Sequence, residues 1–151
     1  MVAYRIGSSA YPLLDGAGAA ASDAARWNSR GRYIIYAAEH YATALLEKAA
    51  QLSSLKMPRT LVYTRIDVPA ATSSEELEPD DLPGWDSTNK SESQHFGDLW
   101  YYQKRTLLLL VPSLVASGLE RNLLINQRHP EFVRVTASLA EPLRCHPNLF
   151  T

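Results

Sequence analysis

The feature that most constrains this sequence is one uninterrupted helix-forming stretch, residues 37–52. It is rich in alanine, leucine, glutamate and lysine and contains neither glycine nor proline, a composition that favours a helix. Its apolar side is expected to carry Ala42, Leu45, Leu46, Ala49 and Leu52. Because β-prone runs precede and follow this helix, the sequence predicts an α+β fold: a single compact domain with a mixed or antiparallel sheet.

Runs of β-branched, aromatic and leucine residues mark the expected strands. They cover residues 2–6, 33–36, 60–68, 107–111, 122–126 and 132–136, and a second, shorter helix is expected over 96–105. Residues 72–93 are dense in serine, acidic residues and proline. A segment of this length without apolar periodicity predicts a surface loop or a functional lid, with its acidic side chains in solvent.

Composition excludes several classes of protein. The 151 residues, 46% of them apolar, suit one globular domain over residues 1–151. A formal net charge of −1 gives no overall basic field to attract nucleic acid. The most apolar run, residues 107–111, is far shorter than the ~20 residues of a membrane helix. The N-terminus lacks the apolar core of a secretion signal, and a single cysteine, Cys145, fits a reducing compartment. We therefore expect a cytoplasmic protein without membrane contact.

Short motifs spaced along most of the chain carry a resemblance to a known family. Arg26-Trp27-Asn28 is followed by Gly31, by a short strand that ends at Tyr36, and by Glu47 in the predicted helix. The other segments are Tyr4-Arg5, Leu82-Pro83-Gly84-Trp85, Gly97-Asp98-Leu99-Trp100, Val111-Pro112-Ser113, and residues 121–126 followed by His129-Pro130. In this order they resemble the RES domain, a family named for its arginine, glutamate and serine, over residues 3–132. One departure is that two alanines precede Arg26 where many members have glycines.

The resemblance implies a fold like that of ADP-ribosyltransferases and a role as the toxin of a type II toxin–antitoxin pair. Such proteins deplete NAD⁺, and they pass ADP-ribose to water, to phosphate, or to a protein such as phosphoribosyl pyrophosphate synthetase. We expect transfer to a protein target and arrest of growth, with NAD⁺ glycohydrolysis or phosphorolysis as the alternative. The implied partner is a helix-turn-helix antitoxin that covers the active-site opening. Any contact with DNA would pass through that antitoxin.

The resemblance assigns Glu47, Arg26 and Tyr36 to catalysis. Cleavage of the nicotinamide–ribose bond leaves positive character on the ribose, which a carboxylate such as Glu47 stabilises. The same carboxylate would serve as general base if the acceptor loses a proton. The Arg26 guanidinium suits phosphate oxygens, and the Tyr36 ring suits stacking on nicotinamide. Without the resemblance, each residue has a simpler interpretation: a solvated helix face for Glu47, a surface residue or an ion pair with Asp23 for Arg26, and a core position for Tyr36.

Binding of NAD⁺ is expected to use Arg5, Arg26, Tyr36, Ser113 and Asn122. Arg5 interrupts an apolar strand, so its charge must be paired or face a cleft. Ser113 is expected either to donate a hydrogen bond to the nicotinamide amide or a ribose oxygen, or to cap a turn. Asn122 would orient other site residues.

Other chemistries find little support in the sequence. The four histidines lack metal-ligand spacing, so no metal is expected. No phosphate-binding glycine loop is present, and NAD⁺ would therefore be a substrate bound outside a Rossmann frame. A catalytically inactive binding module is the alternative from another class, which the presence of Arg26, Tyr36 and Glu47 disfavours. A DNA-binding regulator lacks both a helix-turn-helix pattern and a basic face.

Overall fold

One sheet of eight strands forms the centre of the fold in the computed structural model, which describes residues 1–54 and 56–150. The strands are β1 (Val2–Ser8), β2 (Ile34–Ala38), β3 (Leu61–Asp67), β4 (Ser74–Glu76), β5 (Leu108–Pro112), β6 (Arg121–Asn126), β7 (Thr136–Ala137) and β8 (Glu141–Pro142). The helices are α1 (Ala17–Ala20), α2 (Tyr41–Gln51) and α3 (Ser91–Gln103), with short 3₁₀ turns at Pro79–Asp81, Pro130–Arg134 and Pro147–Leu149.

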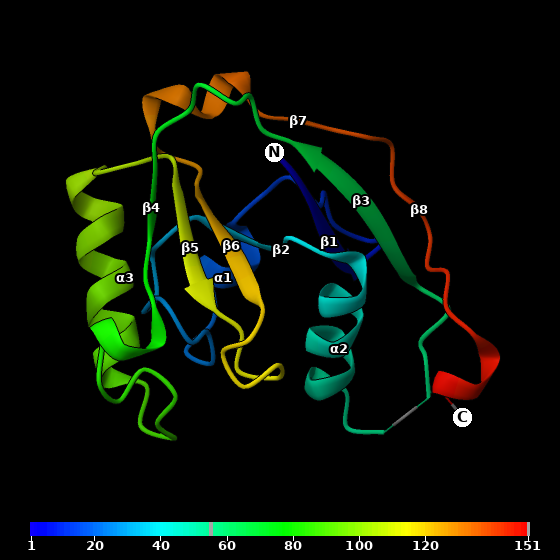
Figure 1. The fold of residues 1–151 in the computed structure, drawn as a ribbon. Coiled ribbons are helices and arrows are strands. Elements are labelled where there is room, and N and C mark those ends of the chain that lie inside the picture. Colours follow the sequence, from blue (N-terminus) through cyan, green and yellow to red (C-terminus); the bar gives the residue numbers. More distant parts are fainter. Residues whose placement is uncertain (55, 151) are drawn as a thin grey trace.

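The sheet has the order β4-β5-β6-β2-β1-β3-β7, and β8 also pairs with β3. Every pair is antiparallel except β4 with β5, so the predicted α+β fold with a mixed sheet is confirmed. In Figure 1, α3 lies beside β4 and β5, whereas α2 lies beside β1 and β2. The last part of the chain runs along β3 through β7 and β8.

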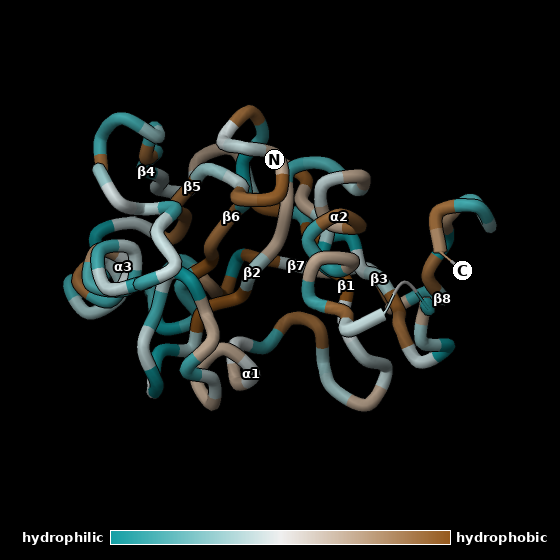
Figure 2. The backbone as a smooth tube through the Cα atoms, turned by 90° about the horizontal axis from the view of Figure 1, so that it is seen from below, coloured by the Kyte–Doolittle hydropathy of each residue, from teal (hydrophilic) through white to brown (hydrophobic). Residues whose placement is uncertain are grey.

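The two faces of β5 and β6 supply two separate cores. Leu108 and Leu110 point to one cluster, and Leu109 and Val111 to the other, as the two-residue period of a strand requires. The second cluster is closed by α3 through Trp100. Because both faces are covered, β5 is buried throughout and reads as a continuous apolar run. Figure 2 shows these apolar strands in the interior, with hydrophilic segments around them.

Two predicted elements have different boundaries in the structure. The helix expected over 37–52 begins only at Tyr41, because Ala37 and Ala38 continue β2 and pair with Leu123 and Asn122 of β6. Leu46, expected on the apolar side, is 54% exposed. The helix expected over 96–105 begins a turn and a half earlier, at Ser91.

Two further predictions are wrong. Residues 72–93 are not a loop throughout: β4 pairs in parallel with β5 at the edge of the sheet, and Leu77 donates its amide to Leu110 O at 2.8 Å. Polar residues suffice there because β4 is an edge strand, with one side open to solvent.

The strand expected over 132–136 is a 3₁₀ turn, Pro130–Arg134, in which His129 Nδ1 accepts from Glu131 N. Pro130 favours that turn because it has no amide proton to lose.

The sheet is weakest between β1 and β2. All seven residues of β1 pair with β3 on one side, and all five of β2 pair with β6 on the other. Between β1 and β2, a single pair is formed, Tyr4 with Ala38. The two strands therefore separate beyond that pair, and the side chains at their facing edges border an opening in the sheet.

The partly exposed carboxylate of Glu131 links Ser73, the residue before β4, to the 3₁₀ turn that follows β6. Glu131 accepts hydrogen bonds from the Ser73 amide at 3.0 Å and from the Ser73 hydroxyl, and that hydroxyl oxygen accepts from Leu107 N at 2.9 Å. These bonds from Ser73 hold the pKa of Glu131 below its ordinary value. A lowered folded-state pKa stabilises the fold above the unfolded-state pKa, about 4.3 for glutamate, and this contribution is lost as the pH falls through the folded-state pKa.

We therefore expect Glu131→Gln to lower the melting temperature at pH 7 and to have a smaller effect near pH 3, because the stabilisation by the carboxylate declines as the pH falls. Thermal unfolding at both pH values measures this. The matched control is Asp80→Asn, at an exposed acidic position. An equal loss at both pH values would contradict an electrostatic role for Glu131.

Candidate functional site

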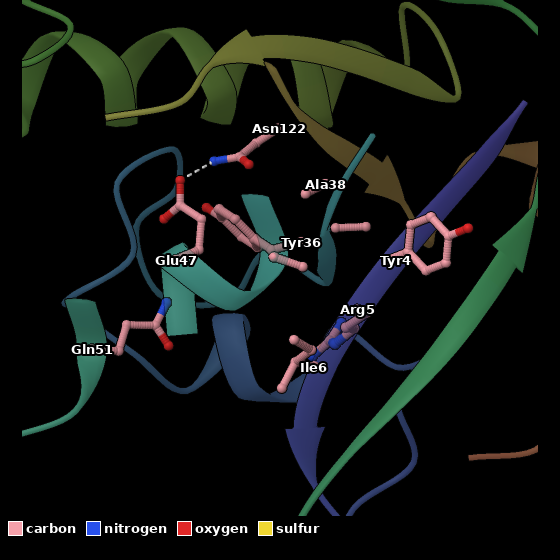
Figure 3. A pocket seen from close by; sticks show the side chains of 10 residues that line it. Tyr4, Arg5, Ile6, Tyr36, Ala38, Glu47, Gln51 and Asn122 are labelled. Atoms are coloured by element: carbon pink, nitrogen blue, oxygen red, sulfur yellow. Dashed lines mark hydrogen bonds between the residues drawn. The ribbon is translucent and has the colours of Figure 1, made fainter. Parts of the chain in front are cut away.

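The opening between β1 and β2 contains a small cavity of about 80 Å³, covered from one side by α2. Its walls come from three elements and the start of a fourth (Figure 3). The lining residues are Tyr4, Arg5 and Ile6 of β1, Tyr36, Ala37 and Ala38 of β2, Ala44, Glu47 and Gln51 of α2, and Asn122 of β6. Four residues that the sequence analysis assigned to NAD⁺ chemistry, Arg5, Tyr36, Glu47 and Asn122, thus line one cavity.

Two neutral donors hold the Glu47 carboxylate in place. Ser113 Oγ donates to Glu47 Oε1 at 2.8 Å, and Asn122 Nδ2 donates to the same oxygen at 2.6 Å (Figure 3 draws the second bond). Ser113 follows β5 directly and is fully buried. Its backbone amide donates a hydrogen bond to Glu120 O at 2.9 Å, which fixes its position. The carboxylate is therefore fixed in position without a cation, and within the described part of the chain its Oε2 accepts no hydrogen bond.

Arg5 brings a desolvated positive charge to the same cavity. Its Nη1 is buried and finds no hydrogen-bond partner within residues 1–54 and 56–150. Burial lowers the pKa of Arg5, and the charge of Asp15 partly opposes this. An arginine nitrogen left in this state costs free energy unless a ligand completes its hydrogen bonds. The position thus fits the sequence argument that a charge within this strand faces a cleft.

Lys48 adds a second cation near Arg5. Burial lowers the pKa of Lys48, and repulsion by Arg5 lowers it further. Its Nζ donates to Gln51 Oε1 at 3.0 Å, and Gln51 lines the cavity one helical turn after Glu47. The sequence analysis missed both residues. Their positions on α2, one and four residues after Glu47, could have indicated that they lie near the same site.

Tyr36 presents its ring to the cavity and uses its hydroxyl elsewhere. The hydroxyl donates to Asn28 Oδ1 at 2.5 Å and accepts from Trp27 N at 3.2 Å. Burial raises the pKa of Tyr36, so the phenol stays neutral at physiological pH. Only the ring is free to contact a ligand.

Arg26 is not brought to this cavity. Its Nη1 donates to the carbonyl oxygens of Trp85 at 2.9 Å and Ser87 at 3.0 Å. The alternative ion pair with Asp23 is not formed either, because Asp23 pairs with Arg30 at 2.7 Å. Arg26 therefore does not line the cavity of Tyr36 and Glu47, and its grouping with them in catalysis stays a prediction.

The segment Arg26-Trp27-Asn28 is a packed support behind Tyr36. Asn28 is fully buried, and its Nδ2 donates to Ala19 O at 3.1 Å and Ser29 O at 2.9 Å. From α3, Ser93 Oγ donates to Arg26 O at 2.6 Å. Gly97 lies so close to this segment that an added Cβ would be 1.8 Å from Trp27 O. The motif thus links α3 to Tyr36, and Asn28 is a positioning residue that the sequence analysis quoted only as part of a motif.

The described residues hold no group of three or more His, Cys, Asp or Glu side chains placed to bind one metal ion. In the same residues, no helix is both long and apolar enough to cross a membrane.

The fold is similar to that of a solved structure. A chain in the crystal structure of the M. tuberculosis MbcT–MbcA toxin–antitoxin complex superposes with a TM-score of 0.73, at 20% sequence identity. The match covers 94% of this chain and 83% of that chain. It places the protein in the same class of α+β fold.

Sequence comparison then identifies the family. The RES domain pattern matches residues 2–148, and the chain belongs to the RES domain family. It is 42% identical to a "Prs ADP-ribosylating toxin" of Sphingobium sp. over 122 residues, which are 78% of this chain and 74% of that protein. It is also 34% identical to a "Toxin Res" of Pseudomonas putida over 133 residues, 87% of this chain and 88% of that protein. The family resemblance predicted from the motifs is confirmed.

The support behind Tyr36 makes a testable contribution to stability. Asn28→Ala leaves the buried Tyr36 hydroxyl without its acceptor, and such a loss costs about 1–3 kcal/mol of unfolding free energy. Chemical denaturation of the two proteins measures the difference. The control is Asn148→Ala, at an exposed asparagine near the C-terminus. If both variants unfold at the same denaturant concentration as the wild type, Asn28 does not hold Tyr36.

Proposed function

We propose that this protein is the toxin of a type II toxin–antitoxin pair, and that it cleaves NAD⁺ at the nicotinamide–ribose bond and transfers ADP-ribose to a protein. The observation that carries the proposal is the Glu47 carboxylate, held by Ser113 and Asn122 in a cavity that Arg5 and Tyr36 also line or border. Family membership and a 42% identical relative named as an ADP-ribosylating toxin support it.

In the proposed reaction, the bond between the ribose C1′ and the nicotinamide nitrogen breaks, and nicotinamide leaves with the electron pair. Positive character develops on the ribose, and Glu47 stabilises it from a fixed position. The free Oε2 of Glu47 accepts a hydrogen bond from a ribose hydroxyl. The acceptor then forms a bond to C1′ and gives up a proton, for which Glu47 is the base because it is the only carboxylate among the lining residues described.

The remaining cavity residues bind and orient the substrate. The Tyr36 ring stacks on nicotinamide, and Arg5 binds a pyrophosphate oxygen, which completes the hydrogen bonding of its buried Nη1. Ser113 and Asn122 position Glu47, the Ser113 oxygen can still accept a hydrogen bond from the substrate, and the second amide hydrogen of Asn122 can be donated to it. The cavity of about 80 Å³ accommodates only one end of the substrate, since pockets that enclose drug-sized ligands measure about 300–1,000 Å³. Arg26 supports the site by holding the segment of Trp85 and Ser87.

The acceptor and the partner are proposed from the relatives. The Sphingobium protein's name points to Prs, and a phosphoribosyl pyrophosphate synthetase is accordingly the proposed target. An antitoxin partner is proposed because the superposed chain belongs to a toxin–antitoxin complex. We propose that the antitoxin carries a helix-turn-helix domain and covers the cavity opening, and that the toxin acts in the cytoplasm.

Glu47→Gln tests the catalytic assignment directly. The amide keeps one oxygen to accept from Ser113 and Asn122, but it loses the charge, and we expect turnover of NAD⁺ to fall by about 100-fold or more. Release of nicotinamide from labelled NAD⁺ by the purified protein measures turnover. Induced expression of the variant should no longer arrest growth.

The control for this test is Glu92→Gln, at an exposed glutamate on α3, which should behave as the wild type. If Glu47→Gln releases nicotinamide at the wild-type rate, Glu47 is not the catalytic carboxylate. The same assay with a cell lysate identifies the acceptor: label on a protein band supports transfer, while free ADP-ribose or its phosphate instead supports hydrolysis or phosphorolysis.

The two arginines should respond differently to substitution. We expect Arg5→Gln to raise the KM for NAD⁺ by about 10–100-fold, because it removes a charge-assisted hydrogen bond to the pyrophosphate. Arg26→Gln should leave the KM within about threefold and lower the melting temperature, because it removes bonds to two backbone carbonyls. Steady-state kinetics and thermal unfolding of both variants decide the matter. A large KM effect for Arg26→Gln alone would restore Arg26 to the substrate site.

A further inference from the structure

A second, larger cavity lies beside the first, and Arg5 lines both. It measures about 390 Å³ and is bordered by the end of β1, the segment that follows it, and α1. Its lining residues are Arg5, Gly7, Ser8, Tyr11, Pro12, Leu13, Asp15, Ala17, Gly18 and Ala21. Arg5 is therefore the residue that the two cavities share, and its buried Nη1 has no partner in the described residues.

Close packing fixes the wall of this second cavity. Leu13 is 8% exposed and lies directly over Gly7, where an added Cβ would be 2.6 Å from Leu13 Cδ2. Gly16 lies against β2, where a Cβ would be 2.5 Å from Ile34 N. The Gly16 amide also donates to Gln127 Oε1 at 2.6 Å. The segment is thus anchored at both ends, so the cavity is preformed, as small-molecule sites usually are.

The lining combines an apolar wall with a few polar groups. Tyr11 stands at the rim with 74% of its surface exposed, an unusual position for an aromatic ring next to Pro12 and Leu13. Asp15 provides a carboxylate near Arg5, and its Oδ1 accepts from Ala17 N at 2.9 Å. An exposed ring suits stacking on a flat heterocycle, and a carboxylate suits the hydroxyls of a ribose.

We infer that this second cavity binds the adenosine half of NAD⁺, with Arg5 at the junction as the contact for the pyrophosphate. The inference rests on the proposed function and deepens it by assigning the substrate's other end. Adenine stacks against Tyr11, the adenosine ribose donates to Asp15, and the nicotinamide ribose lies across Arg5 in the cavity of Glu47. Neither cavity alone would hold the whole dinucleotide, but the two together offer a groove with a cation at its middle.

Gly18→Leu tests the inference by filling the second cavity. A Cβ at Gly18 meets nothing within 4 Å, and its φ lies outside the left-handed region, so the fold tolerates a side chain there. The control is Ala50→Leu, at an exposed position of α2 that lines neither cavity. All variants carry Glu47→Gln, so that added ligand is not consumed. Adenosine 5′-monophosphate, nicotinamide mononucleotide and NAD⁺ are titrated separately, and calorimetry measures each affinity.

We expect Gly18→Leu to weaken binding of adenosine monophosphate and NAD⁺ by at least about tenfold and to leave nicotinamide mononucleotide unchanged. Unchanged adenosine monophosphate affinity overturns the inference, while binding of nicotinamide mononucleotide alone leaves the proposed function standing. If the parent protein binds neither NAD⁺ nor nicotinamide mononucleotide, the proposed function fails, and the inference fails with it. Should circular dichroism show that Gly18→Leu misfolds, Tyr11→Ala replaces it, since so exposed a ring is not needed for folding. A loss of adenosine monophosphate binding then supports the inference, and no loss overturns it.

Discussion

The separation of β1 from β2 is the constraint on which the rest of this molecule depends. On its outer edge, β1 pairs with β3 along its whole length, and β2 does the same with β6. Between β1 and β2, a single residue pair is formed. A continuous antiparallel ladder at this point would pair Arg5 with Ala37 and Ile6 with Tyr36, and backbone would fill the space. Because the ladder stops, side chains of both strands face an opening, and α2, which begins soon after β2, places Glu47 over it.

The charges around that opening are arranged without neutralising one another. Glu47 is held by a hydroxyl and an amide, and Arg5 keeps a buried nitrogen without a partner among the residues described. The unpartnered Arg5 nitrogen is costly in the free protein, since buried charges normally find counter-ions. A ligand with an electropositive ribose at one end and a pyrophosphate in its middle would satisfy both side chains. Charge placement therefore supports the proposed NAD⁺ chemistry alongside the relatives.

The sequence predicted most of the sheet because its strands obey simple patterns. Residues 107–111 are apolar throughout, as a strand buried on both faces must be, and 60–68 alternate. It missed β4, because the polar residues 74–76 gain their place from pairing with β5, a tertiary effect. It placed a strand at 132–136, where Pro130 and the His129 side chain favour a turn instead.

The candidate site was predictable only in part. Spacing on the chain and the family resemblance named Arg5, Tyr36, Glu47, Ser113 and Asn122, and the structure gathers them around one cavity. Arg26 belongs to the same set of motifs, yet its guanidinium donates to the carbonyl oxygens of Trp85 and Ser87. Sequence order does not show which way a side chain points. Nor does it reveal that the segment after β1 encloses a second cavity, because that cavity depends on how Leu13 packs over Gly7.

The support behind Tyr36 has a consequence for reading other members of the family. Arg26-Trp27-Asn28 is the most recognisable motif of the chain, but its side chains and carbonyls are occupied within the fold. Under the proposed mechanism, a relative that keeps this motif while replacing the residues equivalent to Arg5 or Glu47 would retain the architecture without the chemistry. Motif searches that score Arg-Trp-Asn most heavily therefore rank proteins by shared scaffold. Ranking them by enzymatic competence requires the dispersed polar residues around the opening between β1 and β2.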